Sequence, residues 1–157
     1  MIGAVAIHQS RLPMHLPAFT AHLTTLAAAS AVLALAAAPA AALETVTTSS
    51  GLVYQSLKDG GGAQPGAADK VKVHYRGSFP DGREFDSSYQ RGEPIEFPLN
   101  RVIPCWTEGV QRMKVGGKAR LTCPPAIAYG SRGAGGVIPP NATLHFEVEL
   151  LGITPAR

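Results

Sequence analysis

The sequence predicts an α+β fold in which one short helix lies across an antiparallel sheet. The helix is indicated by Ile103, Trp106, Val110 and Met113, apolar residues at spacings of three, four and three that share one helical face. The segments on both sides of it alternate apolar and polar residues, as half-buried strands do. The 17 glycines and 13 prolines also suit short strands and tight turns better than a helical bundle.

The helix is expected to begin at Pro104 and to end at Gly116-Gly117. Proline fits the first helical turn, where its missing N–H costs little, and a glycine pair stops a helix. Trp106 is the only tryptophan in the 157 residues. A short amphipathic helix must bury its apolar face, and the flanking strands offer the surface that covers it.

Six segments are expected to form strands around this helix. Asp81-Gly82 predicts a hairpin between the second and third of them, while Pro94 and Pro98 restrict the fourth to a sheet edge. A Gly- and Pro-rich loop at 124–141 joins the last two, and a loop of that length within a compact domain is usually functional. The six ranges are 52–57, 70–75, 84–86, 95–99, 118–123 and 144–150.

Residues 1–42 are predicted to be a secretory signal peptide. No charged residue lies between Arg11 and Glu44, and an Ala- and Leu-rich run ends in small residues that offer cleavage after Ala42, or alternatively after Ala38. The alternative is an uncleaved leader that anchors the chain in a membrane. Residues 43–50 are expected to be a flexible N-terminal segment, either loose or at a sheet edge, ahead of one domain at 51–154.

Charge and motifs exclude several classes of function. The net charge is only +3 and the basic residues are scattered singly, so nucleic-acid binding is not indicated. Behind the leader, His74 and His145 are far apart, expected at solvent-exposed strand positions, and lack metal-site spacing. Gly133-Ala134-Gly135-Gly136 lacks the spacing of a phosphate-binding loop, and no Gly-x-Ser-x-Gly nucleophile motif occurs. The sequence therefore predicts neither a metal nor a cofactor.

Aromatic side chains are the remaining candidates for a site. They could line an apolar pocket with a few polar groups, which is the usual form of a small binding site; the alternative is that they only fill the core. A buried Asp86 would need a partner such as Arg91, five residues later. The aromatic set is Tyr75, Phe85, Phe97, Trp106, Tyr129 and Phe146.

Several motifs resemble those of FKBP-type peptidyl-prolyl cis–trans isomerases, especially the secreted bacterial members. The likeness runs from about Gly51 to Ile153. The motifs are Val73-His74-Tyr75-Arg76-Gly77, Gly82-Arg83-Glu84-Phe85-Asp86-Ser87-Ser88, Val102-Ile103-Pro104-Cys105-Trp106-Thr107-Glu108-Gly109, Ala128-Tyr129-Gly130, Val137-Ile138-Pro139-Pro140-Asn141-Ala142-Thr143-Leu144 and Phe146-Glu147-Val148-Glu149-Leu150.

The resemblance implies a half-barrel of five or six antiparallel strands wrapped around the short helix, with Trp106 as the floor of a proline pocket. Asp86 and Tyr129 would face the substrate carbonyls, and Arg91 would hold Asp86. The backbone N–H of Ile103 would donate to the ligand. The implied catalytic residues are Tyr75, Phe85, Asp86, Trp106, Tyr129 and Phe146, and the implied substrate-binding residues are Phe97, Val102, Ile103, Ile138 and Arg91.

The implied activity is rotation of X–Pro bonds in folding polypeptides, without a covalent intermediate or cofactor. The implied partners are proline-containing polypeptide clients and macrolide inhibitors of the tacrolimus or rapamycin type. The implied location is the bacterial periplasm or exterior, the alternative being an inner-membrane anchor. Two other functions stay open, namely a chaperone or interaction module without turnover and a purely structural secreted domain.

The chain departs from the family pattern at three places. Cys105 stands where many members have glycine, Ile95 stands where some have an aromatic residue, and the link from Leu99 to Val102 is shorter than in small eukaryotic members. Cys105 and Cys123 form an even pair, which in an oxidising compartment indicates a disulfide. Such a bridge would add about 3 kcal/mol to stability; the alternative is two buried thiols.

Overall fold

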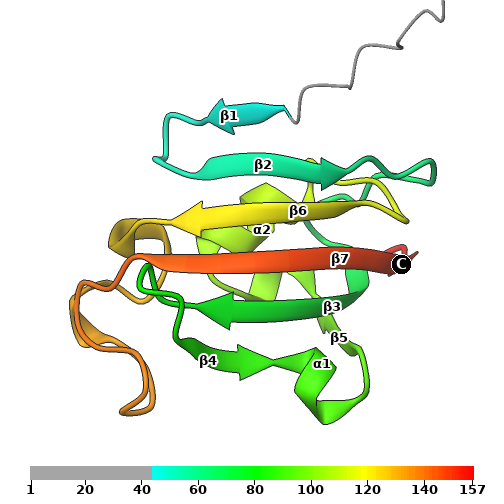
Figure 1. The fold of residues 1–157 in the computed structure, drawn as a ribbon. Helices are drawn as coiled ribbons and strands as arrows, with labels where there is room; N and C mark the ends of the chain where they lie inside the picture. The colour runs from blue at the N-terminus through cyan, green and yellow to red at the C-terminus, as the bar shows by residue number, and fades with distance from the viewer. Residues whose placement is uncertain (1–43) are drawn as a thin grey trace, which may run out of the picture. The chain divides into compact units, whose positions relative to one another are not determined.

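The computed structural model describes residues 44–157, so the predicted signal peptide at 1–42 lies outside the described residues. These residues form one antiparallel sheet of seven strands in the order β1-β2-β6-β7-β3-β4, with β5 also paired to β3 (Figure 1). The sheet is open. It has one strand more than the upper expectation. The strands are β1 Thr45–Thr47, β2 Val53–Lys58, β3 Lys70–Ser78, β4 Glu84–Ser87, β5 Ile95–Pro98, β6 Lys118–Cys123 and β7 Leu144–Thr154.

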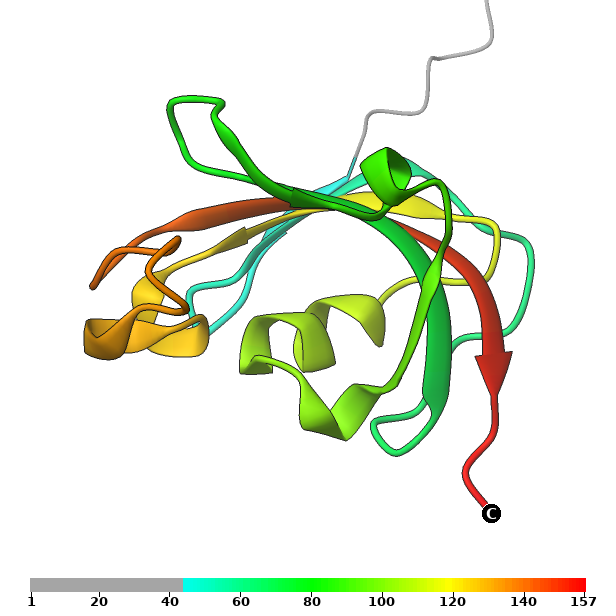
Figure 2. The same ribbon diagram turned by 90° about the horizontal axis from the view of Figure 1, so that it is seen from below.

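The concave face of the sheet wraps around helix α2, Pro104–Val110 (Figure 2). Period-two alternation puts apolar side chains on this face, because successive residues of a strand point to opposite sides. In β3, for example, Val71 and Val73 are fully buried, while Lys70 and Lys72 on the other face are exposed. The predicted α+β class, with an antiparallel half-barrel around one short helix, is confirmed.

Helix α2 is shorter than the sequence suggested. It ends at Val110, six residues before Gly116, and the chain continues in turns in which Met113 N–H donates to the Val110 carbonyl at 3.0 Å. Met113 is still buried, with 2% of its surface exposed. The apolar face was therefore assigned correctly, but its last residue lies on a turn, where spacing alone cannot distinguish it from a helix.

The edge of the sheet beyond β3 is interrupted by a helical turn that was not predicted. β4 pairs with the C-terminal part of β3 and β5 with its N-terminal part, and α1, Ser88–Arg91, lies between them. Ser88 Oγ accepts the Tyr75 N–H at 2.8 Å, which satisfies the β3 backbone where no strand pairs with it on that side. Pro98 of β5 and Pro94, just before it, lie at this edge, as predicted.

The other edge of the sheet begins within the segment 43–50. Thr45–Thr47 form β1 and pair with β2, and the Ser56 N–H donates to the Glu44 carbonyl at 2.9 Å. Residues 45–47 are therefore an edge strand, because their backbone groups find partners in β2. Of the two alternatives for the segment 43–50, the sheet edge is the one that these residues adopt.

The histidines of β3 and β7 are partly buried, which corrects the expectation that solvent surrounds them. His74 stacks on Tyr89 of α1 with ring centroids 4.6 Å apart, and its Nδ1 lies 2.9 Å from Ser88 Oγ. The α1 turn covers His74, so the missed turn explains the missed burial. Among residues 44–157, no three His, Cys, Asp or Glu side chains are grouped so that they could hold a metal ion.

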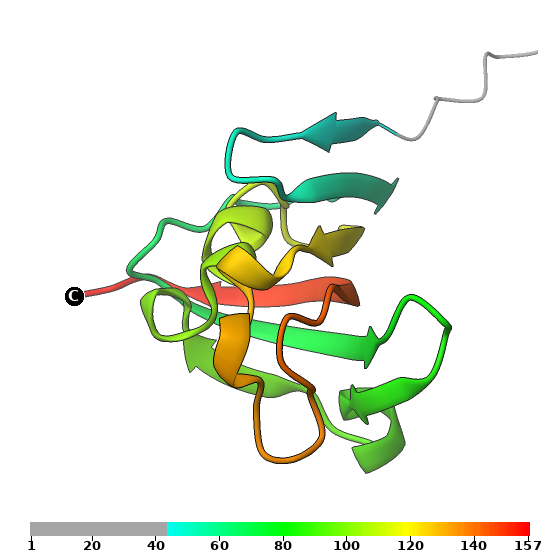
Figure 3. The same cartoon turned by 90° about the vertical axis from the view of Figure 1, so that its left-hand side faces the viewer.

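The connection from β6 to β7 lies on the same side of the sheet as α2 (Figures 2 and 3). It contains two short 3₁₀ turns, η2 at Pro125–Ile127 and η3 at Gly130–Arg132. Its far half closes on itself, since the Ala134 N–H donates to the Ile138 carbonyl at 3.0 Å. Within the described part of the chain, no helix is long and apolar enough to cross a membrane.

Candidate functional site

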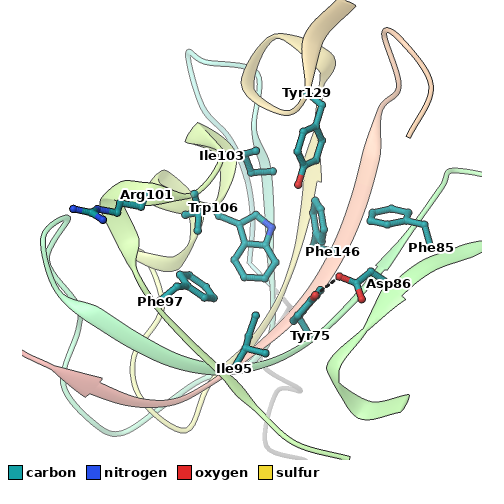
Figure 4. Close-up of a pocket in the computed structure, with 11 residues that line it drawn as sticks. Tyr75, Phe85, Asp86, Ile95, Phe97, Arg101, Ile103, Trp106, Tyr129 and Phe146 are labelled. Carbon is teal, nitrogen blue, oxygen red and sulfur yellow. Dashed lines mark hydrogen bonds between the residues drawn. The ribbon is translucent and has the colours of Figure 1, made fainter. Parts of the chain in front are cut away.

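A cavity of about 530 Å³ opens between α2 and the concave face of the sheet (Figure 4). Its lining comes from β3, β4, β5, β7, the start of α2 and the loop after β6, which are segments far apart in the sequence. Most of the lining side chains are aromatic or aliphatic. The lining residues are Tyr75, Phe85, Asp86, Ile95, Phe97, Arg101, Val102, Ile103, Trp106, Tyr129 and Phe146.

Trp106, in the first turn of α2, forms the floor of this cavity. Its indole is 5% exposed and meets the rings of Tyr75 and Phe146 edge to face, each with centroids 5.2 Å apart. Phe97 of β5 packs on it at 5.4 Å. The buried Nε1–H has no hydrogen-bond acceptor within the described residues. Because aromatic rings surround the indole, the floor of the cavity is largely apolar.

Phe85 and Phe146 form the wall beside β3. Their rings meet at 90° with centroids 5.7 Å apart, and both lie against Gly77. A Cβ at Gly77 would come within 2.6 Å of the Phe85 ring and 3.0 Å of the Phe146 ring. The absence of a side chain at this position is what lets the two rings reach their places.

The polar side of the cavity is a triad of Asp86, Tyr75 and Arg91. The Tyr75 hydroxyl donates to Asp86 Oδ2, Arg91 Nη1 donates to Asp86 Oδ1, and Arg91 Nη2 donates to the Tyr75 hydroxyl at 3.0 Å. Burial alone would raise the pKa of Asp86, but the bonds from Tyr75 and Arg91 outweigh it and hold that pKa below its ordinary value. Asp86 is therefore a carboxylate at neutral pH, kept in one orientation.

The two tyrosines of the cavity stay protonated. Burial raises the pKa of Tyr75, and the bond to Asp86 adds to this effect. Burial likewise raises the pKa of Tyr129, and the charge of Asp86 adds to it. Tyr129 is 38% exposed, and in Figure 4 its hydroxyl points toward the cavity. The site thus combines one fixed acceptor with one free hydroxyl donor over an apolar floor.

Nine of the eleven catalytic and substrate-binding residues that the sequence analysis proposed lie in this lining. Two predicted residues are not part of the lining. Arg91 contacts Asp86 from outside, and Ile138 is 8% exposed and packs in the core at the base of the loop. Arg101 at the rim was not predicted, because a single charged residue in a short link has no spacing that sets it apart. Ile95 was recognised only as a departure from the family pattern.

The predicted disulfide is confirmed. Cys105 of α2 and Cys123 of β6 are bonded with Cα atoms 5.7 Å apart, and both side chains are fully buried. The alternative of two buried thiols is excluded. The bridge joins the first turn of α2 to the end of the strand that leads into the Tyr129 loop.

Comparison with known proteins agrees with this geometry. The sequence profile of the family described as FKBP-type peptidyl-prolyl cis-trans isomerase matches residues 61–151. The chain is similar to the "FKBP-type peptidyl-prolyl cis-trans isomerase FkpA" of Aeromonas hydrophila, with 60% identity over 107 residues that cover 68% of this chain. The protein of the same name from Escherichia coli K12 is 54% identical over 110 residues, or 70% of this chain.

The fold is also similar to a solved structure. The crystal structure of FkpA from Escherichia coli superposes with a TM-score of 0.70 and 52% sequence identity, covering 72% of this chain and 53% of that one. The match spans only 40% of the length of each of the two curated relatives. The matched profile nevertheless includes the floor, the walls and the polar triad of the cavity. This chain belongs to the FKBP-type peptidyl-prolyl cis–trans isomerase family.

Proposed function

We propose that this protein is a peptidyl-prolyl cis–trans isomerase that accelerates rotation about X–Pro bonds in folding polypeptides. The observation that carries the proposal is the aromatic cavity on the Trp106 indole, with the fixed carboxylate of Asp86 at its side. A proline ring is apolar and compact, so it fits such a floor. The carbonyl before it then lies beside the polar groups.

The barrier to be lowered comes from amide resonance and amounts to about 18–20 kcal/mol. Rotation localises the nitrogen lone pair and makes the carbonyl less polar, so water stabilises the planar forms more than the twisted one. A pocket that excludes water and fits the twisted form better than either planar form lowers the barrier. No nucleophile, metal or cofactor takes part in this mechanism.

The proposed roles follow from the positions of the side chains. Trp106 carries the proline ring, and Phe85 and Phe146 keep water from it. Asp86, held by Tyr75 and Arg91, and the Tyr129 hydroxyl orient the substrate carbonyls. Phe97, Val102 and the backbone N–H of Ile103 bind the chain that flanks the proline, and Ile138 supports the loop that bears Tyr129.

Clients would be proline-containing polypeptides outside the cytoplasm. The signal peptide proposed at 1–42, the isomerase domain at 51–154 and the buried Cys105–Cys123 disulfide all fit a periplasmic or secreted protein. The same cavity would take macrolide inhibitors of the tacrolimus or rapamycin type, since it has the volume and the apolar lining of a small-molecule site.

A protease-coupled assay with an X–Phe–Pro tetrapeptide tests the proposal. The full-length protein is expected to accelerate cis-to-trans conversion, and a macrolide of this type is expected to suppress the acceleration. Binding of the peptide without acceleration would instead identify a chaperone or interaction module. If the protein neither binds the peptide nor accelerates its conversion, a purely structural domain is the remaining interpretation.

The activity is also expected to be independent of pH from about pH 5 to pH 9. Because the folded pKa of Asp86 is depressed, its interactions with Tyr75 and Arg91 are present above the ordinary carboxylate pKa and are lost as pH falls through the depressed value. Because the pKa of Tyr75 is raised, its donated bond persists until pH rises beyond the ordinary phenol pKa. The pH profile of kcat/KM measures both limits.

The pH profile of the Arg91→Met variant tests the role of Asp86 more directly, because this change removes one of the groups that lower the pKa of Asp86. Its acid limb should move to higher pH. Arg120→Met is the matched control, because Arg120 pairs with Glu147 at 2.7 Å, away from the cavity lining, and should leave the profile unchanged. A decline in wild-type activity centred near pH 6 would contradict the role assigned to Asp86.

A further inference from the structure

The Cys105–Cys123 disulfide joins the two segments that carry opposite parts of the cavity. Cys105 immediately precedes Trp106, the floor, and Cys123 ends β6 six residues before Tyr129. Both cysteines are fully buried and neither lines the cavity, so the sulfur atoms do not touch a ligand. Any effect of the bridge on the site must act through the placement of these neighbours.

Helix α2 has few means of holding its own position. It has seven residues, fewer than an isolated helix needs to be stable, and no side chain caps its N-terminus at Ile103. Its place depends on tertiary contacts. Thr107 Oγ1 donates to the Leu99 carbonyl at 2.7 Å, and Gly109 approaches Leu121 so closely that a Cβ would lie 2.7 Å from that side chain.

These two contacts lie in the later part of the helix. The first turn, which bears Trp106 and adjoins Ile103, meets the sheet through the rings packed on the indole, and the disulfide is its one covalent tie to the sheet among the described residues. An enzyme can lose about 100-fold in rate when a substrate-positioning group is displaced by about 1 Å. A covalent tie one residue from the indole therefore acts at the point where displacement matters most.

We propose that Cys105 and Cys123 are positioning residues, whose disulfide holds the Trp106 floor and the Tyr129 loop at the separation that a proline substrate needs. The inference rests on the proposed isomerase function and deepens it. It assigns to the bridge a role in activity that is separate from its contribution to stability.

The experiment compares the oxidised wild-type protein with the Cys105→Ala/Cys123→Ala variant at a temperature where circular dichroism shows both to be fully folded. The variant is expected to have a kcat/KM for the X–Phe–Pro peptide about ten-fold below that of the wild type. This loss is smaller than the one that a full displacement of the indole would cause. Because Trp106 is the only tryptophan, its emission reports the floor directly. The emission maximum should move to longer wavelength and acrylamide should quench it more strongly.

Met113→Ala is the matched control for stability. Met113 is buried at the far end of the α2 segment and lines a different cavity, next to Tyr54. Its truncation should lower the melting temperature while leaving kcat/KM and the emission maximum at wild-type values.

If the double alanine variant does not fold, Cys105→Ala/Cys123→Val replaces it, since valine refills the space on the strand.

The outcomes separate the two proposals. A folded disulfide-free variant with wild-type kcat/KM and wild-type emission would overturn the positioning role. So would an equal loss of kcat/KM in Met113→Ala, because the effect would then follow stability alone. An oxidised wild-type protein without isomerase activity would instead overturn the proposed function.

Discussion

Replacement of Trp106 with alanine is expected to lower kcat/KM for an X–Phe–Pro peptide by about 100-fold or more, equivalent to about 2.7 kcal/mol of transition-state stabilisation. In the proposed mechanism the proline ring rests on the indole, and Tyr75, Phe97 and Phe146 pack against this indole. Its removal leaves a hole that water enters and loosens the three rings around it. Water at the carbonyl raises the barrier toward that of the uncatalysed reaction.

The same change also costs stability, about 3–5 kcal/mol for a buried tryptophan. Activity must therefore be measured below the melting transition, with the folded fraction followed by near-ultraviolet circular dichroism of the tyrosines. Trp106→Phe retains a flat apolar floor and should lose less activity than Trp106→Ala. A folded Trp106→Ala protein with wild-type kcat/KM would show that the cavity is not the site.

Gly77→Ala is expected to lower kcat/KM by about ten-fold at a temperature where the variant is folded, since ring displacement perturbs substrate positioning. The added methyl carbon would lie 2.6 Å from Phe85, closer than these atoms can approach, and 3.0 Å from Phe146, a tight contact. Phe85 is half-buried on the edge strand β4, so its ring can move more readily than that of the buried Phe146. The wall of the cavity then opens to water.

Gly152→Ala is the matched control in another strand. A Cβ at Gly152 meets only Lys72 at 3.9 Å, an ordinary contact, and this position is not part of the cavity lining. Its kcat/KM should equal that of the wild type. Equal activity in Gly77→Ala and Gly152→Ala would mean that the Phe85 wall has no part in turnover.

The strands and the apolar face of α2 could be predicted because each is indicated by the spacing of residues that are close together in the sequence. Alternation at every second residue identified β3 and β7, and the spacing of Trp106, Val110 and Met113 identified the face of α2. Both patterns arise from the geometry of a single element against one core. They need no information about the rest of the chain.

The features that were missed depend on contacts between distant segments. The α1 turn exists because Ser88 satisfies the backbone of β3 at Tyr75, a bond across 13 residues that no local pattern shows. α2 stops at Val110 because the chain then turns toward Gly116, whose N–H donates to Leu150. Convergence of the aromatic residues on one cavity came from the family resemblance. From the residues alone, aromatic side chains that merely fill the core were the commoner interpretation.

The interrupted edge of the sheet has a consequence for association with unfolded chains. A long, regular edge strand offers unpaired N–H and C=O groups on which an unfolded chain can add and aggregate. Here β4 and β5 have four residues each and are separated by α1, and Pro98 contributes no N–H. An extended polypeptide beside the cavity therefore cannot extend the sheet at this edge by a continuous strand.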